Sequence, residues 1–203
     1  IETDFAVDSS GFSTSTYDRW YDEKYGKKKS RRTFVKTHLM CGVKTHIITS
    51  VEATPYISGD NVQFPYLVNE TAKSFNINEV SADKAYSDRR NLQIVDSLGG
   101  TAYIPFKSST TGKANHHHGK DNLWATMFHY YSFNRQDFLE HYHKRSNVES
   151  TFSMIKAKFG GFVRSKSETA QVNEVLCKLV CHNICVLIQS IHELGIEPIF
   201  TKE

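Results

Sequence analysis

Hydrophobic and polar positions alternate at the start of the chain. Residues 4–12, DFAVDSSGF, alternate and end in turn-forming residues, which predicts a first β-strand. Residues 33–43 and 46–55 are rich in β-branched and apolar side chains, and a short turn between them would make an antiparallel pair. The polar and basic residues 21–32 that precede this pair are typical of a loop or a hairpin tip.

Helical and extended segments then follow one another. Residues 60–75 predict a helix, with Asp60 as its N-cap and Pro65 as a weak point. The segments after it are predicted to be a strand within 77–86, a helix over 87–99, a strand over 101–106, a loop over 107–123, a helical region over 123–159 and a helix over 169–194. This order predicts an α/β fold with a mixed sheet that carries helices on its faces.

The stretch from 142 to 156, YHKRSNVESTFSMIK, has helical length and contains neither proline nor glycine. At 100° per residue it has an apolar face, formed by Val148, Phe152, Ile155 and Phe159. A second face, within about 40° of Glu149, carries Tyr142, Arg145, Glu149 and Lys156. A helix that packs on a sheet would therefore hold a carboxylate between cations at the edge of its apolar stripe.

Composition restricts the class of protein only broadly. The 203 residues suit one domain with a sizeable core, and 39% hydrophobic and 23% charged residues are ordinary for a globular protein. The net charge of +3 permits a polyanionic partner without requiring one. Because the chain begins with Ile1 and enters a strand at once, we expect it to be a piece of a longer protein.

The last predicted helix contains Cys177, Cys181 and Cys185 at intervals of four residues. These thiols could form a metal or redox site, but buried thiols on one core face are the simpler interpretation. With no disulfide framework apparent, a reducing compartment is expected. Lys178 and the polar pair after Cys181 interrupt the apolar run, which favours a buried helix over a membrane span.

Three carboxylates stand at positions where the predicted elements could bring them together. Asp8 lies near the end of the first strand, Asp83 near the end of the strand within 77–86, and Glu149 on the helix described above. If the two strands are neighbours, the three side chains meet beside the sheet, and their repulsion would call for a cation. Oxygen ligands of this kind suit Mg²⁺ or Mn²⁺. Taken singly, each carboxylate could equally be a solvated or capping group.

The segment from Tyr142 to Lys156 fits the pattern Y-(2)-R-(3)-E-(6)-K, which resembles the signature of one group of DDE insertion-sequence transposases. VDSSGF around Asp8 resembles the first aspartate motif of that group, and SADKAYSD around Asp83 resembles the second. The three motifs occur in the order of the family and span essentially the whole chain. The resemblance implies an RNase H-like mixed sheet flanked by helices, with a loop and helix insertion at about 107–135 before the glutamate-bearing helix.

The resemblance also implies roles for these residues. The three carboxylates, Asp8, Asp83 and Glu149, would form a catalytic triad that holds two ions of Mg²⁺, for which Mn²⁺ could substitute. Tyr142, Arg145 and Lys156 would contact DNA at the transposon end. The activity implied is metal-dependent cleavage at the element's ends, followed by transfer of the freed strand into target DNA.

Partners and location follow from the same resemblance. The partner would be double-stranded DNA, with a homodimer in the DNA complex and no membrane. The location would be cytoplasmic, and the nucleoid in a prokaryote. A helical DNA-binding region is expected before Ile1. Two other functions stay open: a metal-dependent nuclease of the same fold that cuts without joining, and a DNA-binding protein that has lost catalysis.

Three further features are weaker candidates. The basic run within 21–32 could bind phosphates, although a solvated hairpin tip explains it equally well. The three histidines at 116–118 could ligate a metal, but they occur in a polar loop. In relatives that form DNA hairpins, an aromatic side chain from the insertion contacts a flipped base, and Trp124 stands in that region. For Trp124 a packing role is the simpler interpretation.

Overall fold

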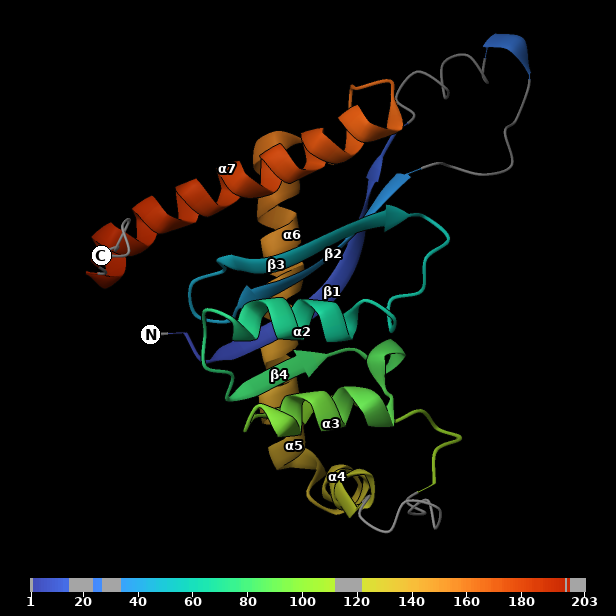
Figure 1. Ribbon diagram of the computed structural model, residues 1–203, viewed down its shortest axis with the longest axis vertical. Helices are drawn as coiled ribbons and strands as arrows, with labels where there is room; N and C mark the ends of the chain where they lie inside the picture. The colour runs from blue at the N-terminus through green and yellow to red at the C-terminus, as the bar shows by residue number, and fades with distance from the viewer. Residues whose placement is uncertain (1, 15–23, 27–33, 112–121, 196, 198–203) are drawn as a thin grey trace.

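The computed structural model describes residues 2–14, 24–26, 34–111, 122–195 and 197 (Figure 1). The basic residues 27–32 and the histidines at 116–118 lie outside these ranges. The elements of the described part are β1 (Asp4–Ser13), β2 (Phe34–Gly42), β3 (Ile48–Pro55), α2 (Phe64–Ala72), β4 (Glu79–Ala82), the 3₁₀ turn η1 (Lys84–Tyr86), α3 (Arg89–Ser97), β5 (Thr101–Tyr103), α4 (Asn122–Phe133), α5 (Arg135–Tyr142), the 3₁₀ turn η3 (His143–Arg145), α6 (Ser146–Phe159) and α7 (Glu168–Leu194).

The strands form one mixed sheet in the order β3-β2-β1-β4-β5. Strand β1 lies in the middle, antiparallel to β2 and parallel to β4, and β4 is parallel to β5. The predicted α/β fold with a mixed sheet is therefore confirmed. The predicted antiparallel pair is β2 and β3, joined by a tight turn after Gly42.

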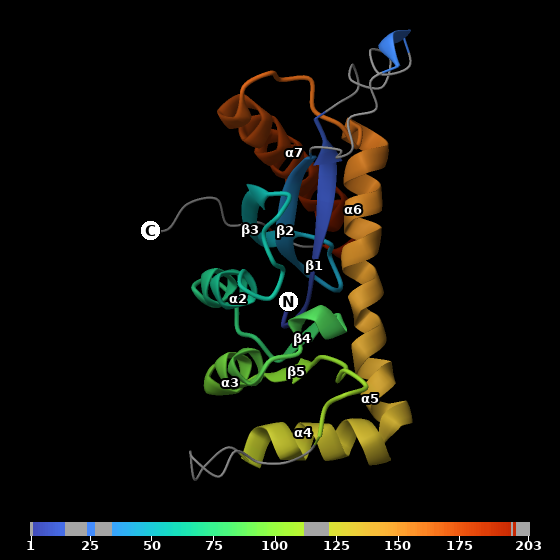
Figure 2. The same cartoon turned by 90° about the vertical axis from the view of Figure 1, so that its right-hand side faces the viewer.

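Helices cover both faces of the sheet. Figure 2 shows α2 and α3 on one side and α6 on the other. Alternate residues of β1 serve the two layers: Phe5 and Val7 pack in the core under α2 and α3, whereas Ala6 and Phe12 pack in the core under α6 and α7. Asp8 has the same parity as Ala6, so it belongs to the α6 face.

Helix α2 begins later than predicted. Its first residue is Phe64 and its N-cap is Gln63, so the prediction that Asp60 caps this helix is wrong. Pro65 falls in the first turn, where a missing backbone N–H costs no helical hydrogen bond. The carboxylate of Asp60 instead accepts a hydrogen bond from the Ser9 hydroxyl at 2.6 Å. This contact ties the segment before α2 to the middle of β1.

The helical region after residue 122 is divided into several helices. Asn134, with φ −112° and ψ 45°, leaves the helical conformation and separates α4 from α5. The 3₁₀ turn η3 then separates α5 from α6. Tyr142 and Lys156 consequently do not share one continuous α-helix, which corrects the row of four side chains that the 100° spacing predicts. Gly160, at φ 82°, ends α6 where the sequence predicts a break.

Helix α7 crosses α6 (Figure 1), and two of its polar side chains, His182 and Asn183, face the β2–β3 pair. Asn183 donates a hydrogen bond to the Ile48 carbonyl and accepts one from the Ile48 N–H, both at 2.8 Å. His182 is fully buried, and its Nε2 donates to the His46 carbonyl at 3.1 Å. The polar residues that interrupt the apolar run therefore hold α7 on the edge strand β3.

The outer face of α7 is apolar, so the helix is not buried all round. Cys177 and Cys181 are exposed and Cys185 is half-buried, so the interpretation of these thiols as members of a core face is wrong. Val180, Ile184 and Ile188 are 60%, 53% and 53% exposed. In the described part of the chain α7 alone has the length and composition of a membrane span, a test that core helices of soluble proteins also pass. The absence of a membrane partner stays a prediction.

Candidate active site

The parallel pairing of β1 and β4 brings two of the candidate carboxylates side by side where β4 ends. Asp8 lies in the middle of β1 (Asp4–Ser13), so the prediction that it stands near the end of this strand is wrong. Val7 is paired with Ala82, and Asp8 and Asp83 are the next residues of their chains. Asp83 stands just after the end of β4 and caps η1 by accepting a hydrogen bond from the Ala85 N–H at 2.5 Å. The condition set by the sequence, that the two aspartate-bearing strands be neighbours, is met.

Glu149 approaches Asp8 from the first turn of α6. The apolar stripe predicted for this helix packs on the sheet: Val148, Phe152 and Ile155 are buried. Arg145, immediately before α6, joins the helix to β1. One of its nitrogens donates to Asp8 Oδ2 at 2.9 Å and the other donates to Glu149 Oε1 at 2.5 Å. Arg145 and Glu149 thus form an i, i+4 ion pair, and the same guanidinium also holds Asp8.

The electrostatics of Asp8 show that the three carboxylates influence one another. Burial raises the pKa of Asp8, the Ser9 N–H and Arg145 lower it, and the charges of Asp83 and Glu149 raise it. The net effect is a raised pKa, because one guanidinium does not compensate for desolvation and two further anions. Glu149 remains 54% exposed along its side chain.

Three carboxylates, two of them bound to one guanidinium, provide oxygen donors of the kind that a hard divalent cation prefers. In the described residues, no three His, Cys, Asp or Glu side chains are already gathered tightly enough to hold a metal ion. Arg145 occupies oxygens of Asp8 and Glu149 and neutralises part of their charge. By residue type and charge the three carboxylates suit a divalent cation, although Arg145 is bound to two of them in this structure.

Lys156, near the end of α6, contacts β1 two residues beyond Asp8 and on the same face of the sheet. Its Nζ donates to the Ser10 hydroxyl at 2.7 Å and stands 5.6 Å from the centre of the Phe12 ring. Burial lowers the pKa of Lys156. Its side chain is half-buried. Among the described residues no carboxylate pairs with it.

Tyr142 and Trp124 pack against other side chains. Tyr142 is half-buried beside the core under α2 and α3, with the Arg145 guanidinium 5.9 Å from its ring centre. Trp124 is 8% exposed and packs edge-on against Phe106 at 4.8 Å, with Arg89 over its ring at 4.8 Å. The position of Trp124 favours the packing role over contact with a base.

A hollow of about 880 Å³ opens beside Asp83, a feature that the sequence analysis missed. Its walls come from η1, the segment after β5, helix α4 and the start of α5, and they carry Lys84, Lys107 and Arg135. Phe106, Phe128 and Tyr131 line it as well, and Arg135 lies 4.8 Å from the Tyr131 ring centre. In the sequence, only the insertion at about 107–135 pointed to this region. The residues of η1 that complete the hollow come earlier in the chain, before α3.

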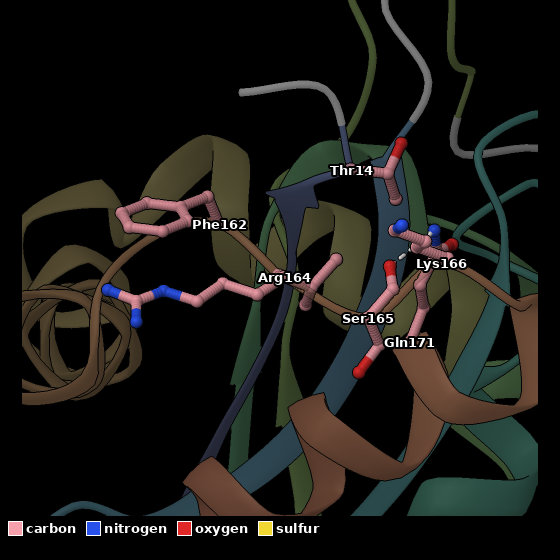
Figure 3. Close-up of a pocket in the computed structure, with 7 residues that line it drawn as sticks. Thr14, Phe162, Arg164, Ser165, Lys166 and Gln171 are labelled. Atoms are coloured by element: carbon pink, nitrogen blue, oxygen red, sulfur yellow. Dashed lines mark hydrogen bonds between the residues drawn. The ribbon is translucent and has the colours of Figure 1, made fainter. Parts of the chain in front are cut away.

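A second hollow, of about 900 Å³, lies between the end of β1 and the start of α7 (Figure 3). Phe162 and Arg164 extend to one side of it, and Ser165, Lys166 and Gln171 lie on the other. No candidate carboxylate lines this hollow among the residues described. It therefore stands apart from the site built by β1, β4 and α6.

A second charged cluster, also missed, lies at the opposite end of β4. Lys144 donates to Asp4 Oδ2 and to Glu79 Oε2, both at 2.7 Å. His141 Nδ1 lies 2.9 Å from Glu79 Oε2, and its ring stacks on Tyr103 at 4.3 Å. Single residues of opposite charge carry little signal in a sequence, so this cluster became visible only with the fold.

Two comparisons with known proteins bear on this site. The chain matches the family described as the transposase DDE domain over residues 2–184. Among solved structures its fold is similar to that of the piggyBac transposase in a synaptic complex with hairpin DNA, with a TM-score of 0.53 and 9% identity. The similarity covers 96% of this chain and 49% of that chain, so this chain spans about half the length of that transposase. At this identity the likeness shows the fold, which is RNase H-like.

Proposed function

Since the chain belongs to the transposase DDE domain family, we propose that it is the catalytic core of a DNA transposase. In this proposal it cleaves phosphodiester bonds at the ends of a mobile element and joins the freed ends to target DNA. The observation that carries the proposal is the register of β1 and β4, which puts Asp8, in the middle of β1, beside Asp83, just after the end of β4, with Glu149 tied to Asp8 through one guanidinium.

Asp8, Asp83 and Glu149 would hold two divalent cations, Mg²⁺ or Mn²⁺. When bound, two such ions activate water and stabilise the attacking and leaving oxygens of an in-line displacement. The protein's part is to hold the ligands in place. Backbone pairing of β1 with β4 fixes the two aspartates, and the buried stripe of α6 fixes Glu149.

The hollow beside Asp83 suits the DNA strand that leads away from the scissile phosphate. Lys84, Lys107 and Arg135 are exposed and, within the described ranges, none is paired with a carboxylate. Cations interleaved with aromatic rings bind phosphates and stack bases without sequence preference. A homodimer on the DNA belongs to the same proposal, because each element end needs a catalytic site.

The proposal is tested by Glu149→Gln in the full-length protein, with Glu140→Gln as the matched control. Glu140 is an exposed carboxylate on α5 away from Asp8. Cleavage of an end-bearing duplex in Mg²⁺ and in Mn²⁺ should fall at least about 100-fold in Glu149→Gln, since loss of a ligand should exceed the 10–100-fold typical of groups that merely support ligands. The control should keep its activity.

Strand transfer should be measured separately, with pre-cut DNA ends. One site performs both displacements in the proposal, so Glu149→Gln should lose transfer together with cleavage. Substantial cleavage left in Glu149→Gln would contradict the triad. A parent protein that cleaves but never joins pre-cut ends would be a nuclease of the same fold.

A further inference from the structure

Two consecutive residues of η3 hold strand β1 at two places. Lys144 binds Asp4 and Arg145 binds Asp8. The two aspartates are four residues apart on β1, which corresponds to about 13 Å along a strand. Two ion pairs therefore join the turn before α6 to β1. Glu149 lies in the first turn of the helix that follows, so both ion pairs affect its position.

The ion pairs of Lys144 are largely shielded from solvent. Its carboxylate partners have side chains only 25% and 13% exposed, and each lies 2.7 Å from the ammonium nitrogen. Glu79 is also bound by His141, whose ring stacks on Tyr103 at an interplanar angle of 8°. Both carboxylates of this cluster are bound by the Lys144 ammonium, and Glu79 is contacted by the His141 ring as well.

The ion pairs of Arg145 are partly exposed to solvent. Its guanidinium serves Asp8 and Glu149 together, and Glu149 is 54% exposed. No cation pairs with Asp83 in the described part of the chain. Both oxygens of Asp8 are occupied, Oδ1 by the Ser9 N–H at 2.8 Å and Oδ2 by Arg145 at 2.9 Å. A divalent cation held by these carboxylates would meet the guanidinium at the same oxygens, and two cations there would repel each other.

We infer that Lys144 is a positioning residue that keeps the Glu149 helix docked on the sheet whether or not metal is present, whereas Arg145 is an exchangeable counter-ion that gives up Asp8 and Glu149 to a divalent cation. The inference rests on the proposed function, because it takes Asp8 and Glu149 as metal ligands. Its consequence is a link between metal loading and DNA contact: an Arg145 released from the carboxylates has its guanidinium free for a phosphate.

The test is Mn²⁺ affinity and thermal unfolding of the full-length protein, for Arg145→Gln, Lys144→Gln and Lys144→Arg. Arg145→Gln should lower Tm without metal, because the carboxylates lose their counter-ion, and should bind Mn²⁺ about tenfold more tightly, because no guanidinium competes. Lys144→Gln should bind Mn²⁺ about tenfold more weakly, since Glu149 is less well placed. Lys144→Arg should restore much of that affinity.

The outcomes separate this inference from the proposed function. If Asp8→Asn and Glu149→Gln do not weaken Mn²⁺ binding, the triad itself is wrong. If they weaken it while Arg145→Gln binds Mn²⁺ no more tightly than the parent, Arg145 is not an exchangeable counter-ion. If Lys144→Gln lowers Tm but leaves Mn²⁺ affinity unchanged, Lys144 is structural only.

Crystals of the parent protein grown with and without Mn²⁺ keep the inference testable should the Arg145→Gln protein fail to fold. The expected result is an Arg145 guanidinium that leaves both carboxylates when Mn²⁺ is bound. A guanidinium still within about 3.5 Å of Asp8 and Glu149 beside bound Mn²⁺ would overturn the exchange.

Discussion

Two carboxylates, Asp60 and Asp8, lie at the middle of β1 on opposite faces of the sheet. The surroundings of Asp60 are those of a structural group, whereas those of Asp8 are those of a group available for chemistry. Asp60 lies on the α2 face, where the Ser9 hydroxyl donates to it at 2.6 Å and Lys36 at 2.8 Å. Asp8, the neighbour of Ser9 in the chain, lies on the α6 face with one guanidinium and two other carboxylates. Adjacent residues of one strand thus serve two unlike sites.

The pKa values of the two groups shift in opposite directions. Burial raises the pKa of Asp60, but hydrogen bonds from Lys36 and Ser9 outweigh it and the pKa ends below its ordinary value. Burial also raises the pKa of Asp8, and there the neighbouring anions help to keep it raised. The α2 face therefore satisfies its carboxylate, whereas the α6 face leaves a deficit of positive charge. Such a deficit is typical of a functional site.

The largest expected difference is in activity. Asp8→Asn should lower DNA cleavage at least about 100-fold, because a ligand is lost where even supporting groups are worth 10–100-fold. Asp60→Asn should lower it by less than about tenfold, since its side chain acts on the site only through Ser9. Single-turnover cleavage rates of both full-length variants measure this. Equal losses of cleavage rate in the two variants would show that the catalytic role is not confined to the α6 face.

Stability should respond in the opposite sense. Asp60→Asn removes the charged partner of Lys36 and should lower the free energy of unfolding by about 1–2 kcal/mol. Asp8→Asn should leave that free energy unchanged or raise it at neutral pH, because the ionised form is disfavoured at that position. Urea denaturation in the absence of metal compares the two. A large destabilisation by Asp8→Asn would mean that its pair with Arg145 holds the fold.

The pH dependence sharpens the same contrast. The folded pKa of Asp60 lies below the ordinary value of 3.8, so its contribution is present above pH 3.8 and is lost as pH falls through the folded pKa. The folded pKa of Asp8 lies above 3.8, so its ionisation costs stability at neutral pH and this cost disappears as pH falls towards 3.8. The difference in unfolding free energy between each variant and the parent, measured from pH 3 to 7, should therefore shrink towards low pH with opposite signs.

The smallest expected effect concerns the lysines of the two faces. Lys36 is bound by Asp60, whereas Lys156 donates to the Ser10 hydroxyl and, among the residues that the structure describes, pairs with no carboxylate. If Lys156 binds a phosphate, Lys156→Ala should reduce the slope of log K for DNA against log salt by about one. Its unfolding free energy should change by less than about 1 kcal/mol, through lost contact with Phe12. Lys36→Ala is the control, and a reduced slope there too would remove the distinction.

The alternation of apolar positions was sufficient to predict the mixed sheet and the order of its elements. The periodicity of α6 placed Val148, Phe152 and Ile155 in the core and so turned Glu149 towards Asp8. Both results depend on neighbouring residues only, which a sequence shows directly. The assignment of Asp8, Asp83 and Glu149 as metal ligands stays a prediction, as does DNA contact by Tyr142, Arg145 and Lys156.

Features that depend on distant contacts could not be predicted. The outward Cys177 and Cys181 were assigned to the core because hydrophobicity was taken as the guide to the buried face of α7. His182 and Asn183 instead face inwards, because the backbone of the β2–β3 turn and the start of β3 offer them hydrogen-bond partners. The break at η3 and the hollow beside Asp83 likewise depend on side chains that only the folded chain brings together.

Helix α6 follows β1 and β4 in the chain, and this order has a consequence for biosynthesis. Strands β1 and β4 leave the ribosome well before Glu149 and its neighbour Arg145 are made. A product truncated ahead of α6, from a premature stop codon or a broken message, would carry both aspartates and lack the third proposed ligand. For a protein proposed to cut chromosomes, a fragment that stops before α6 would lack the proposed nuclease activity, which requires translation through α6.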